Sequence, residues 1–132
     1  MHFLRLHTAF FRDTVKIVIF IYGKKIMKVR EYSTFEEALK SIITEEKQYF
    51  LIRHTLEAGE KIRPHYHPNA HEWIIVHNTI CTVTMERVKK TFSAEHIYLL
   101  ISFPKKKIHS FEVHVPVSYF VVRDRKDKTV YI

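Results

Sequence analysis

Four side chains of this sequence could bind one metal ion together. His65 and His67 are two residues apart, and residues i and i+2 of a β-strand point to the same face of a sheet. Two imidazoles at that spacing can share one metal ion. A turn follows them, and the strand that begins at Glu72 can return a carboxylate to the same point. A metal needs at least one more ligand from elsewhere in the chain, and the downstream candidate is His109.

The composition suits a single globular domain with room for such a site. The chain has 132 residues, of which 46% are hydrophobic and 27% charged, and a chain of this length can bury a core without disulfides. Its single cysteine, Cys81, excludes a disulfide framework and a cysteine-based zinc cluster. We expect Cys81 to be a small buried side chain of a strand, because its neighbours are apolar.

Short strands must position the four candidates. Apolar residues recur at helical spacing only near the start, which predicts one helix from Phe35 to Glu46, capped by Ser33 or Thr34. The next segment, residues 49–59, reads as a strand that ends at Gly59. Seven further short strands follow at close spacing, separated by turns. This rhythm predicts an antiparallel sandwich or barrel.

The first 26 residues differ from the rest. Val15 to Tyr22 could form a strand that ends at Gly23, and the segment could add a strand or a dimer arm to the fold. Alternatively, it lies upstream of a true start at Met27. We therefore divide the chain into an N-terminal extension, residues 1–26, and a single domain, residues 27–132. Charges such as Arg12 interrupt the apolar stretch, which excludes a membrane-spanning helix.

The net charge of +8 first suggests a nucleic-acid partner. However, residues 1–32 carry +5 of it, so the body of the chain is close to neutral. We therefore expect neither a nucleic-acid partner nor a membrane partner. The sequence has no convincing signal peptide and has one free cysteine, so the expected location is the cytoplasm.

The spacing of the candidate ligands resembles the first motif of the cupin superfamily. In that motif a glycine is followed after five residues by His-x-His, and after four more by a glutamate. Gly59, His65, His67 and Glu72 fill these places. The resemblance covers roughly residues 48–125.

The second cupin motif has a proline, a glycine two residues later and a histidine three residues after that. Pro104, Lys106 and His109 occupy these places, so the glycine is replaced. The glycine that ends the first motif is also missing, and Asn78 stands there. A Gly-Asp turn before the second motif is replaced by Glu95-His96. Asparagine can adopt the left-handed conformation that such a turn needs.

The resemblance implies a mainly all-β fold, a small cupin-type double-stranded β-helix or jelly-roll barrel with one N-terminal α-helix. It also implies one divalent metal, held by His65, His67, Glu72 and His109. Such a ligand set suits Fe, Mn, Ni, Co or Zn. Four protein ligands would leave two octahedral positions open, which is the layout of a catalytic site. Cupins of this size are commonly homodimers.

Two functions fit this resemblance. One is a metal-dependent enzyme that acts on a small molecule as a dioxygenase, decarboxylase or isomerase, with Glu72 as a catalytic residue. The other is a non-catalytic module that binds or senses a small molecule. Arg63 shares strand parity with His65 and His67, so it is a further site candidate that would suit an anionic substrate. A solvated arginine at the barrel rim is the alternative. His71 should point away from Glu72, because successive strand residues face opposite sides.

Overall fold

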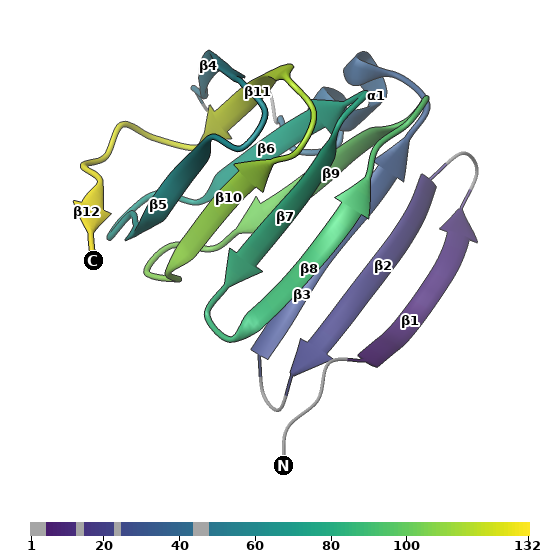
Figure 1. Ribbon diagram of the computed structural model, residues 1–132, viewed down its shortest axis with the longest axis horizontal. Helices are drawn as coiled ribbons and strands as arrows, with labels where there is room; N and C mark the ends of the chain where they lie inside the picture. The colour runs from purple at the N-terminus through teal and green to yellow at the C-terminus, as the bar shows by residue number, and fades with distance from the viewer. Residues whose placement is uncertain (1–4, 13–14, 23–24, 44–47) are drawn as a thin grey trace.

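The computed structural model describes residues 5–12, 15–22, 25–43 and 48–132, with side chains from Met27 onward. Its strands form two antiparallel sheets (Figure 1). The seven-stranded sheet has the order β1 (Arg5–Arg12), β2 (Val15–Tyr22), β3 (Lys25–Tyr32), β9 (Tyr98–Phe103), β6 (Glu72–His77), β11 (Val117–Arg123) and β4 (Phe50–Leu56). The five-stranded sheet has the order β12 (Val130–Tyr131), β5 (Lys61–Tyr66), β10 (His109–Val113), β7 (Ile80–Met85) and β8 (Val88–Ser93). The predicted all-β, barrel-like fold with one helix near the N-terminus is confirmed.

The main core lies between the two sheets, and the inward-facing side chains of the strands fill it. On β6, Ile74 and Val76 belong to the core between the sheets, whereas Trp73 and Ile75 belong to a second cluster on the outer face of the larger sheet. Glu72 has the parity of Ile74, so its carboxylate faces the interior. Cys81 is fully buried in the main core, as predicted.

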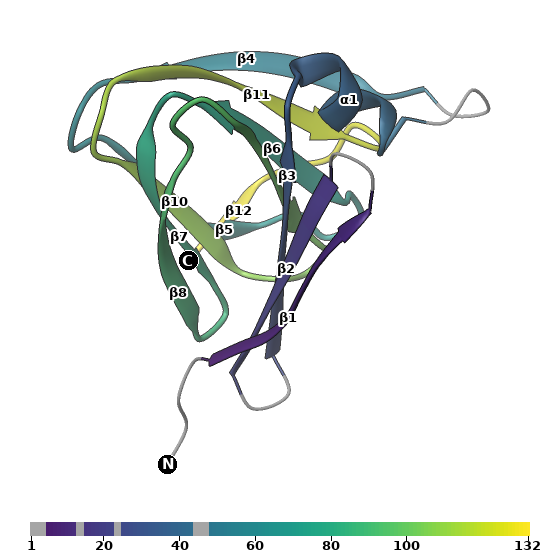
Figure 2. The same ribbon diagram turned by 90° about the vertical axis from the view of Figure 1, so that its right-hand side faces the viewer.

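The helix α1 (Phe35–Lys40) covers the outer face of the larger sheet (Figure 2). Thr34 is its N-cap, and the Thr34 hydroxyl accepts a hydrogen bond from the backbone N–H of Glu37 at 3.1 Å. The predicted helix continued to Glu46, but the helix ends at Lys40. Ser41 explains the early end, because its hydroxyl bonds the carbonyl of Ala38 at 2.6 Å and residues 41–42 form a turn. Residues 44–47 lie outside the described residues.

The N-terminal segment continues the larger sheet beyond β3 (Figure 2). The strand predicted over Val15–Tyr22 is β2, which pairs antiparallel with β3. The sequence did not indicate β1, which pairs with β2 and has only that neighbour among the described strands. The division between an extension and a domain at Met27 stays a prediction.

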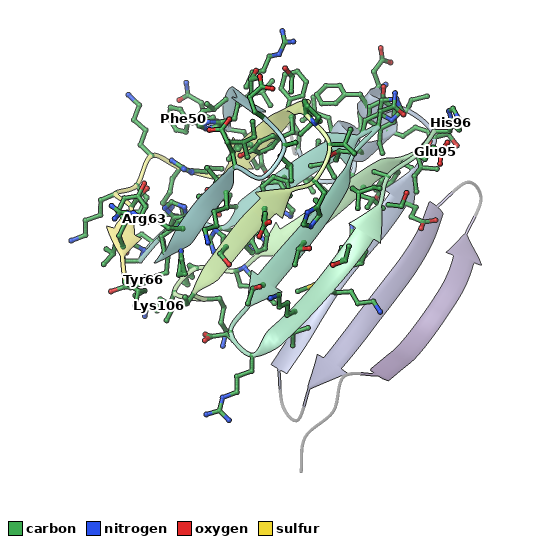
Figure 3. The ribbon with its side chains drawn as sticks, in the orientation of Figure 1. Phe50, Arg63, Tyr66, Glu95, His96 and Lys106 are labelled. Carbon is green, nitrogen blue, oxygen red and sulfur yellow. The ribbon has the colours of Figure 1, made fainter. Side chains whose placement is uncertain are left out.

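The turns that lack the expected glycines adopt the backbone conformation that glycine would supply. The φ angles are 53° at Asn78, 61° at His96 and 68° at Lys106. Gly59 itself has a φ of 84°. Figure 3 shows His96 and Lys106 at opposite ends of the molecule, so left-handed turns occur at both ends of the strands. In the described part of the chain, no helix has both the length and the apolar character needed to cross a membrane.

Candidate metal centre

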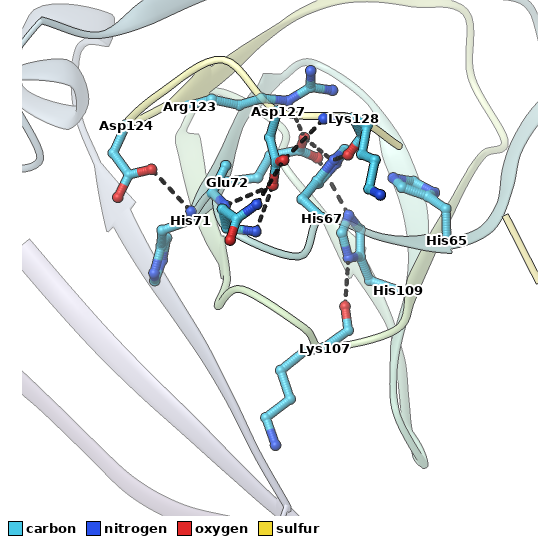
Figure 4. Close-up of polar contacts among 12 residues, drawn as sticks. His65, His67, His71, Glu72, Lys107, His109, Arg123, Asp124, Asp127 and Lys128 are labelled. Atoms are coloured by element: carbon cyan, nitrogen blue, oxygen red, sulfur yellow. Dashed lines mark hydrogen bonds and ion pairs between the residues drawn. The ribbon is translucent and has the colours of Figure 1, made fainter. Parts of the chain in front are cut away.

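Four buried side chains converge at one end of the space between the sheets. His65 lies on β5, His67 directly follows that strand, Glu72 begins β6 and His109 begins β10. Each of the four is at most 5% exposed. One nitrogen or oxygen atom from each residue lies within 4.8 Å of all the others. The structure thus brings together all four residues that the sequence singled out as metal ligands (Figure 4).

The sheet register explains this convergence. His109 of β10 is the direct cross-strand partner of His65 of β5, and directly opposed residues lie on the same face. Glu72 comes from the other sheet, and its inward parity directs the carboxylate to the same point. The group therefore joins the two sheets.

All three imidazoles are held in the same tautomer by the backbone. The Nδ1 atom of His65 lies 2.8 Å from the carbonyl oxygen of Arg63, and that of His109 lies 3.0 Å from the carbonyl of Lys107. The Nδ1 atom of His67 lies 3.1 Å from the carbonyl of Lys128. A carbonyl oxygen can only accept, so each Nδ1 must carry a proton. In the neutral rings, each Nε2 atom then has an unprotonated lone pair.

The carboxylate of Glu72 is the common neighbour of the His67 and His109 Nε2 atoms. Its Oε2 atom lies 2.8 Å from Nε2 of His67 and its Oε1 atom lies 3.3 Å from Nε2 of His109. Arg123 donates from Nε to Oε2 at 2.7 Å. Burial works to raise the pKa of the Glu72 carboxyl, but His109, His67 and Arg123 outweigh that effect and hold the pKa well below its usual range. Glu72 is therefore an ionised, buried carboxylate.

One buried nitrogen of this group lacks a hydrogen-bond partner. Nε2 of His67 makes no hydrogen bond among the described residues, although a carboxylate oxygen lies 2.8 Å away. Burial lowers the pKa of His65, which further favours its neutral form. An imidazole Nε2 atom this close to a carboxylate oxygen needs a cation between the two atoms, either a proton or a metal ion. The donor set thus fits a divalent transition metal, with three nitrogens and one carboxylate as ligands.

A cavity of about 110 Å³ adjoins this group. The side chains of His65, Glu72 and His109 form one wall, and Phe103 stacks on the His109 ring at a centroid distance of 4.2 Å. Apolar side chains line most of the remaining walls: Ile62, Ile74, Phe111 and Val121. The polar groups on these walls come from His54, Tyr119, Arg123, Thr129 and Tyr131. Burial raises the pKa of Tyr119, so its phenol stays a neutral hydrogen-bond donor.

The C-terminal segment closes the side of the centre that faces β5. The Lys128 carbonyl orients His67, and the Asp127 carboxylate accepts hydrogen bonds from the backbone N–H groups of Asn69 and Ala70. Further on, β12 pairs with β5, which places Tyr131 opposite His65 with a ring-centroid distance of 5.7 Å. The C-terminal segment therefore supports the loop between His67 and Glu72, which contains Asn69 and Ala70.

Arg63 does not line the cavity, although the sequence made it a site candidate. Its side chain is exposed, and its guanidinium lies 4.0 Å from the centre of the Tyr131 ring of β12 (Figure 3). Its backbone carbonyl contributes to the centre instead, because it accepts the hydrogen bond from Nδ1 of His65. A role for its side chain toward substrate stays a prediction.

His71 points away from the four ligands, as strand alternation predicts. Its ring packs at a tilt against Trp73, with the ring centroids 4.2 Å apart, and its backbone N–H donates to the carboxylate of Asp124 at 3.0 Å (Figure 4). Glu72, the adjacent residue, faces the interior.

Two contributors to the centre were missed in the sequence. Arg123 belongs to a mixed-charge stretch that looks like a solvated chain end, and only its pairing with Glu72 across β11 and β6 brings it to the carboxylate. Tyr131 lies on a strand of two residues, which is too short to show a period. Arg123 and Val121 are two residues apart on β11, so they face the same side, and both line the cavity. This strand alternation was the one sequence signal that could have identified Arg123.

Comparison with known proteins assigns no family to this chain. No protein-family model matches it, and no curated protein has a significantly similar sequence. What the site can do therefore follows from its own side chains and their geometry.

Proposed function

We propose that this protein is a cupin that holds one divalent transition metal between His65, His67, Glu72 and His109. The observation that carries the proposal is the common tautomer of the three histidines. Each donates its Nδ1–H to a backbone carbonyl, which is how proteins orient imidazole ligands of metals. The atoms left over converge within 4.8 Å together with a carboxylate.

The turns are compatible with the cupin assignment, and Glu86, which matches no glycine of the pattern, also has a positive φ angle, of 55°. Three positions that lack the glycines or the glycine-containing turn of the cupin pattern have positive φ angles, at Asn78, His96 and Lys106. Left-handed backbone is costly for such residues, so its presence there indicates that the fold requires it. Lys106 also donates its backbone N–H to the carbonyl of His67 at 2.8 Å, which links the loop of the second motif to the first.

The adjoining cavity supports action on a small molecule. When bound, the metal would supply Lewis-acid or redox chemistry at the cavity wall. Tyr119 can donate a hydrogen bond to a substrate oxygen, and apolar side chains line part of the cavity. Arg123 keeps Glu72 ionised and oriented. These features suit an enzyme of the dioxygenase, decarboxylase or isomerase type, with Glu72 among its catalytic residues.

Metal analysis of the purified full-length chain tests the proposal. We expect about one divalent metal per chain by elemental mass spectrometry, and loss of it in His65→Ala and His109→Ala. His71→Ala is the matched control, because His71 adjoins Glu72 in sequence and points away from the cluster. Circular dichroism checks that each variant is folded. No metal after reconstitution with Fe, Mn, Ni, Co and Zn, or equal metal in all variants, would contradict the proposal.

Substrate screening separates the enzyme from a non-catalytic binding or sensing module. Turnover of a small molecule that disappears in Glu72→Ala would establish catalysis. Saturable binding of a molecule that is recovered unchanged would establish the binding module.

The proposal also retains a homodimer formed through β1, the outermost strand of the larger sheet, and a cytoplasmic location. Sedimentation velocity of the full chain and of a chain that starts at Met27 tests the dimer.

A further inference from the structure

A second cavity, of about 450 Å³, is lined mainly by outward-facing residues of the seven-stranded sheet, and the core residue Met85 of β7 also belongs to its lining. None of the four candidate metal ligands lines it. Met27 and Val29 of β3 face the main core, so Lys28 and Arg30 face outward. Trp73 lies on the outward face of β6, and Ser102 alternates with the core residue Phe103 on β9.

The lining of this outer cavity carries positive charge and no carboxylate. Lys28 and Arg30 contribute two cations from one strand, and no aspartate or glutamate belongs to the described lining. Burial, followed by the charge of Arg30, lowers the pKa of Lys28. Two cations that repel each other in a partly desolvated space favour an anion between them.

Two nitrogen atoms of this cavity are buried without a hydrogen-bond partner. Among the described residues, three buried side-chain polar atoms have none: Arg30 Nε, His71 Nε2 and His67 Nε2. The last belongs to the metal centre, whereas the first two belong to residues that line the outer cavity. Because an arginine Nε–H can only donate, the missing partner of Arg30 is an acceptor. Buried polar groups are nearly always paired, so these atoms point to a ligand.

The rest of the lining indicates what the anion is attached to. Trp73 offers an indole surface. Its ring packs against those of His71 and Tyr49, with centroid distances of 4.2 Å and 6.2 Å. Hydroxyl groups of Ser41 and Ser102 border the same space. A flat apolar group can pack against the indole while its charged end reaches the two cations.

We propose that the outer cavity binds a small organic oxyanion, a carboxylate or a phosphate carried on a planar apolar body. Arg30 and Lys28 hold the oxyanion, and Trp73 packs against the body. This site differs from the metal centre, because none of the four candidate metal ligands lines it, and it gives the protein a second place for a small anion.

Trp73 is the only tryptophan of the chain, so its fluorescence reports directly on this cavity. The full-length protein is titrated with benzoate, phenyl phosphate, inorganic phosphate and phenol, with correction for ligand absorbance. We expect a saturable change with benzoate or phenyl phosphate, and whichever binds more tightly identifies the oxyanion. Phenol, which is neutral, and inorganic phosphate, which has no apolar body, should bind more weakly. No saturable change with either aryl anion would overturn the proposal.

Variants test which residues bind. Arg30→Met and Lys28→Met should each weaken binding of the better probe by roughly tenfold or more, and Arg30→Lys should retain part of it. Lys89→Met, an exposed cation on β8, is the matched control and should leave binding unchanged. The affinity should be the same in metal-loaded and metal-free protein. Equal affinity in Arg30→Met and wild type, or loss of binding on metal removal, would contradict an outer-face site.

Discussion

The Nε atom of Arg123 lies 2.7 Å from Oε2 of Glu72, and the two residues are direct cross-strand partners of β11 and β6. The guanidinium therefore fixes one carboxylate oxygen of the candidate metal centre. Arg123 is on the same strand as Val121, which faces the cavity, so the ion pair and the cavity wall share one rigid element.

Loss of this ion pair should weaken metal binding. We expect Arg123→Met to lower the affinity for a divalent metal such as Co²⁺ by roughly 10- to 100-fold, because residues that orient a ligand typically contribute that much. Arg123→Lys should recover part of the loss. Isothermal titration measures the affinity, and Arg125→Met, an exposed neighbour, is the control. An unchanged affinity in Arg123→Met would mean that Glu72 is oriented without the guanidinium.

Glycine at the left-handed turns should stabilise the protein. Lys106 and His96 have φ angles of 68° and 61°, and that conformation costs a residue with a Cβ atom about 1–2 kcal/mol. Glycine removes the strain but loses more backbone entropy, so Lys106→Gly and His96→Gly should each raise the free energy of unfolding by about 0.5–1 kcal/mol. Urea denaturation measures it. Lys105→Gly, beside Lys106 but without a positive φ, should instead leave stability unchanged or lower it.

Asp127 should make stability depend on acid pH. Burial works to raise the pKa of its carboxyl, but hydrogen bonds from Asn69, Ala70 and Lys128 together hold it below its usual value. A carboxyl whose pKa is lower in the folded state stabilises the protein above its unfolded pKa, about 3.9, and this contribution is lost as the pH falls through the folded value.

The test compares the wild type with Asp127→Asn. The variant should have a lower urea midpoint than the wild type at neutral pH. This difference in midpoint, the gap between the two proteins, should shrink as the pH falls below about 4. Asp124→Asn serves as a second carboxylate variant of the same segment, since the Asp124 carboxylate accepts a hydrogen bond from the backbone N–H of His71. A gap that is independent of pH would show that the Asp127 contacts do not depend on its charge.

Cys81 should not react while the protein is folded. Its side chain is fully buried, and burial raises the pKa of its thiol to about 12, so the reactive thiolate is scarce at neutral pH. A disulfide reagent that releases a coloured thiolate should therefore label the native protein only at the rate of unfolding, and label it at once in denaturant. Rapid labelling of the native protein would contradict the burial of Cys81 in the core.

The ligand group could be predicted from the sequence because its geometry is local. The spacing of His65 and His67 places both on one face by strand alternation, and a short turn returns the chain to Glu72 at the start of β6, in the other sheet. His109 required a motif, since its pairing with His65 joins segments that are distant in the sequence.

Other features depended on contacts that no local pattern encodes. Arg123 reaches Glu72 only because β11 pairs with β6, and Tyr131 reaches His65 only because the short β12 pairs with β5. The end of α1 was missed for a different reason. The apolar spacing continues to Ile43, but the hydroxyl of Ser41 bonds the carbonyl of Ala38 where a helix would continue.

The hydrogen bond between His67 and the Lys128 carbonyl joins residues 61 positions apart, and Glu72 meets His109 across 37. Closing chain segments of this length costs entropy that only later contacts repay, so such contacts form slowly. The centre cannot be completed until the last strands have docked. Binding of a coloured ion such as Co²⁺ at this centre would therefore report the completion of folding of the whole chain.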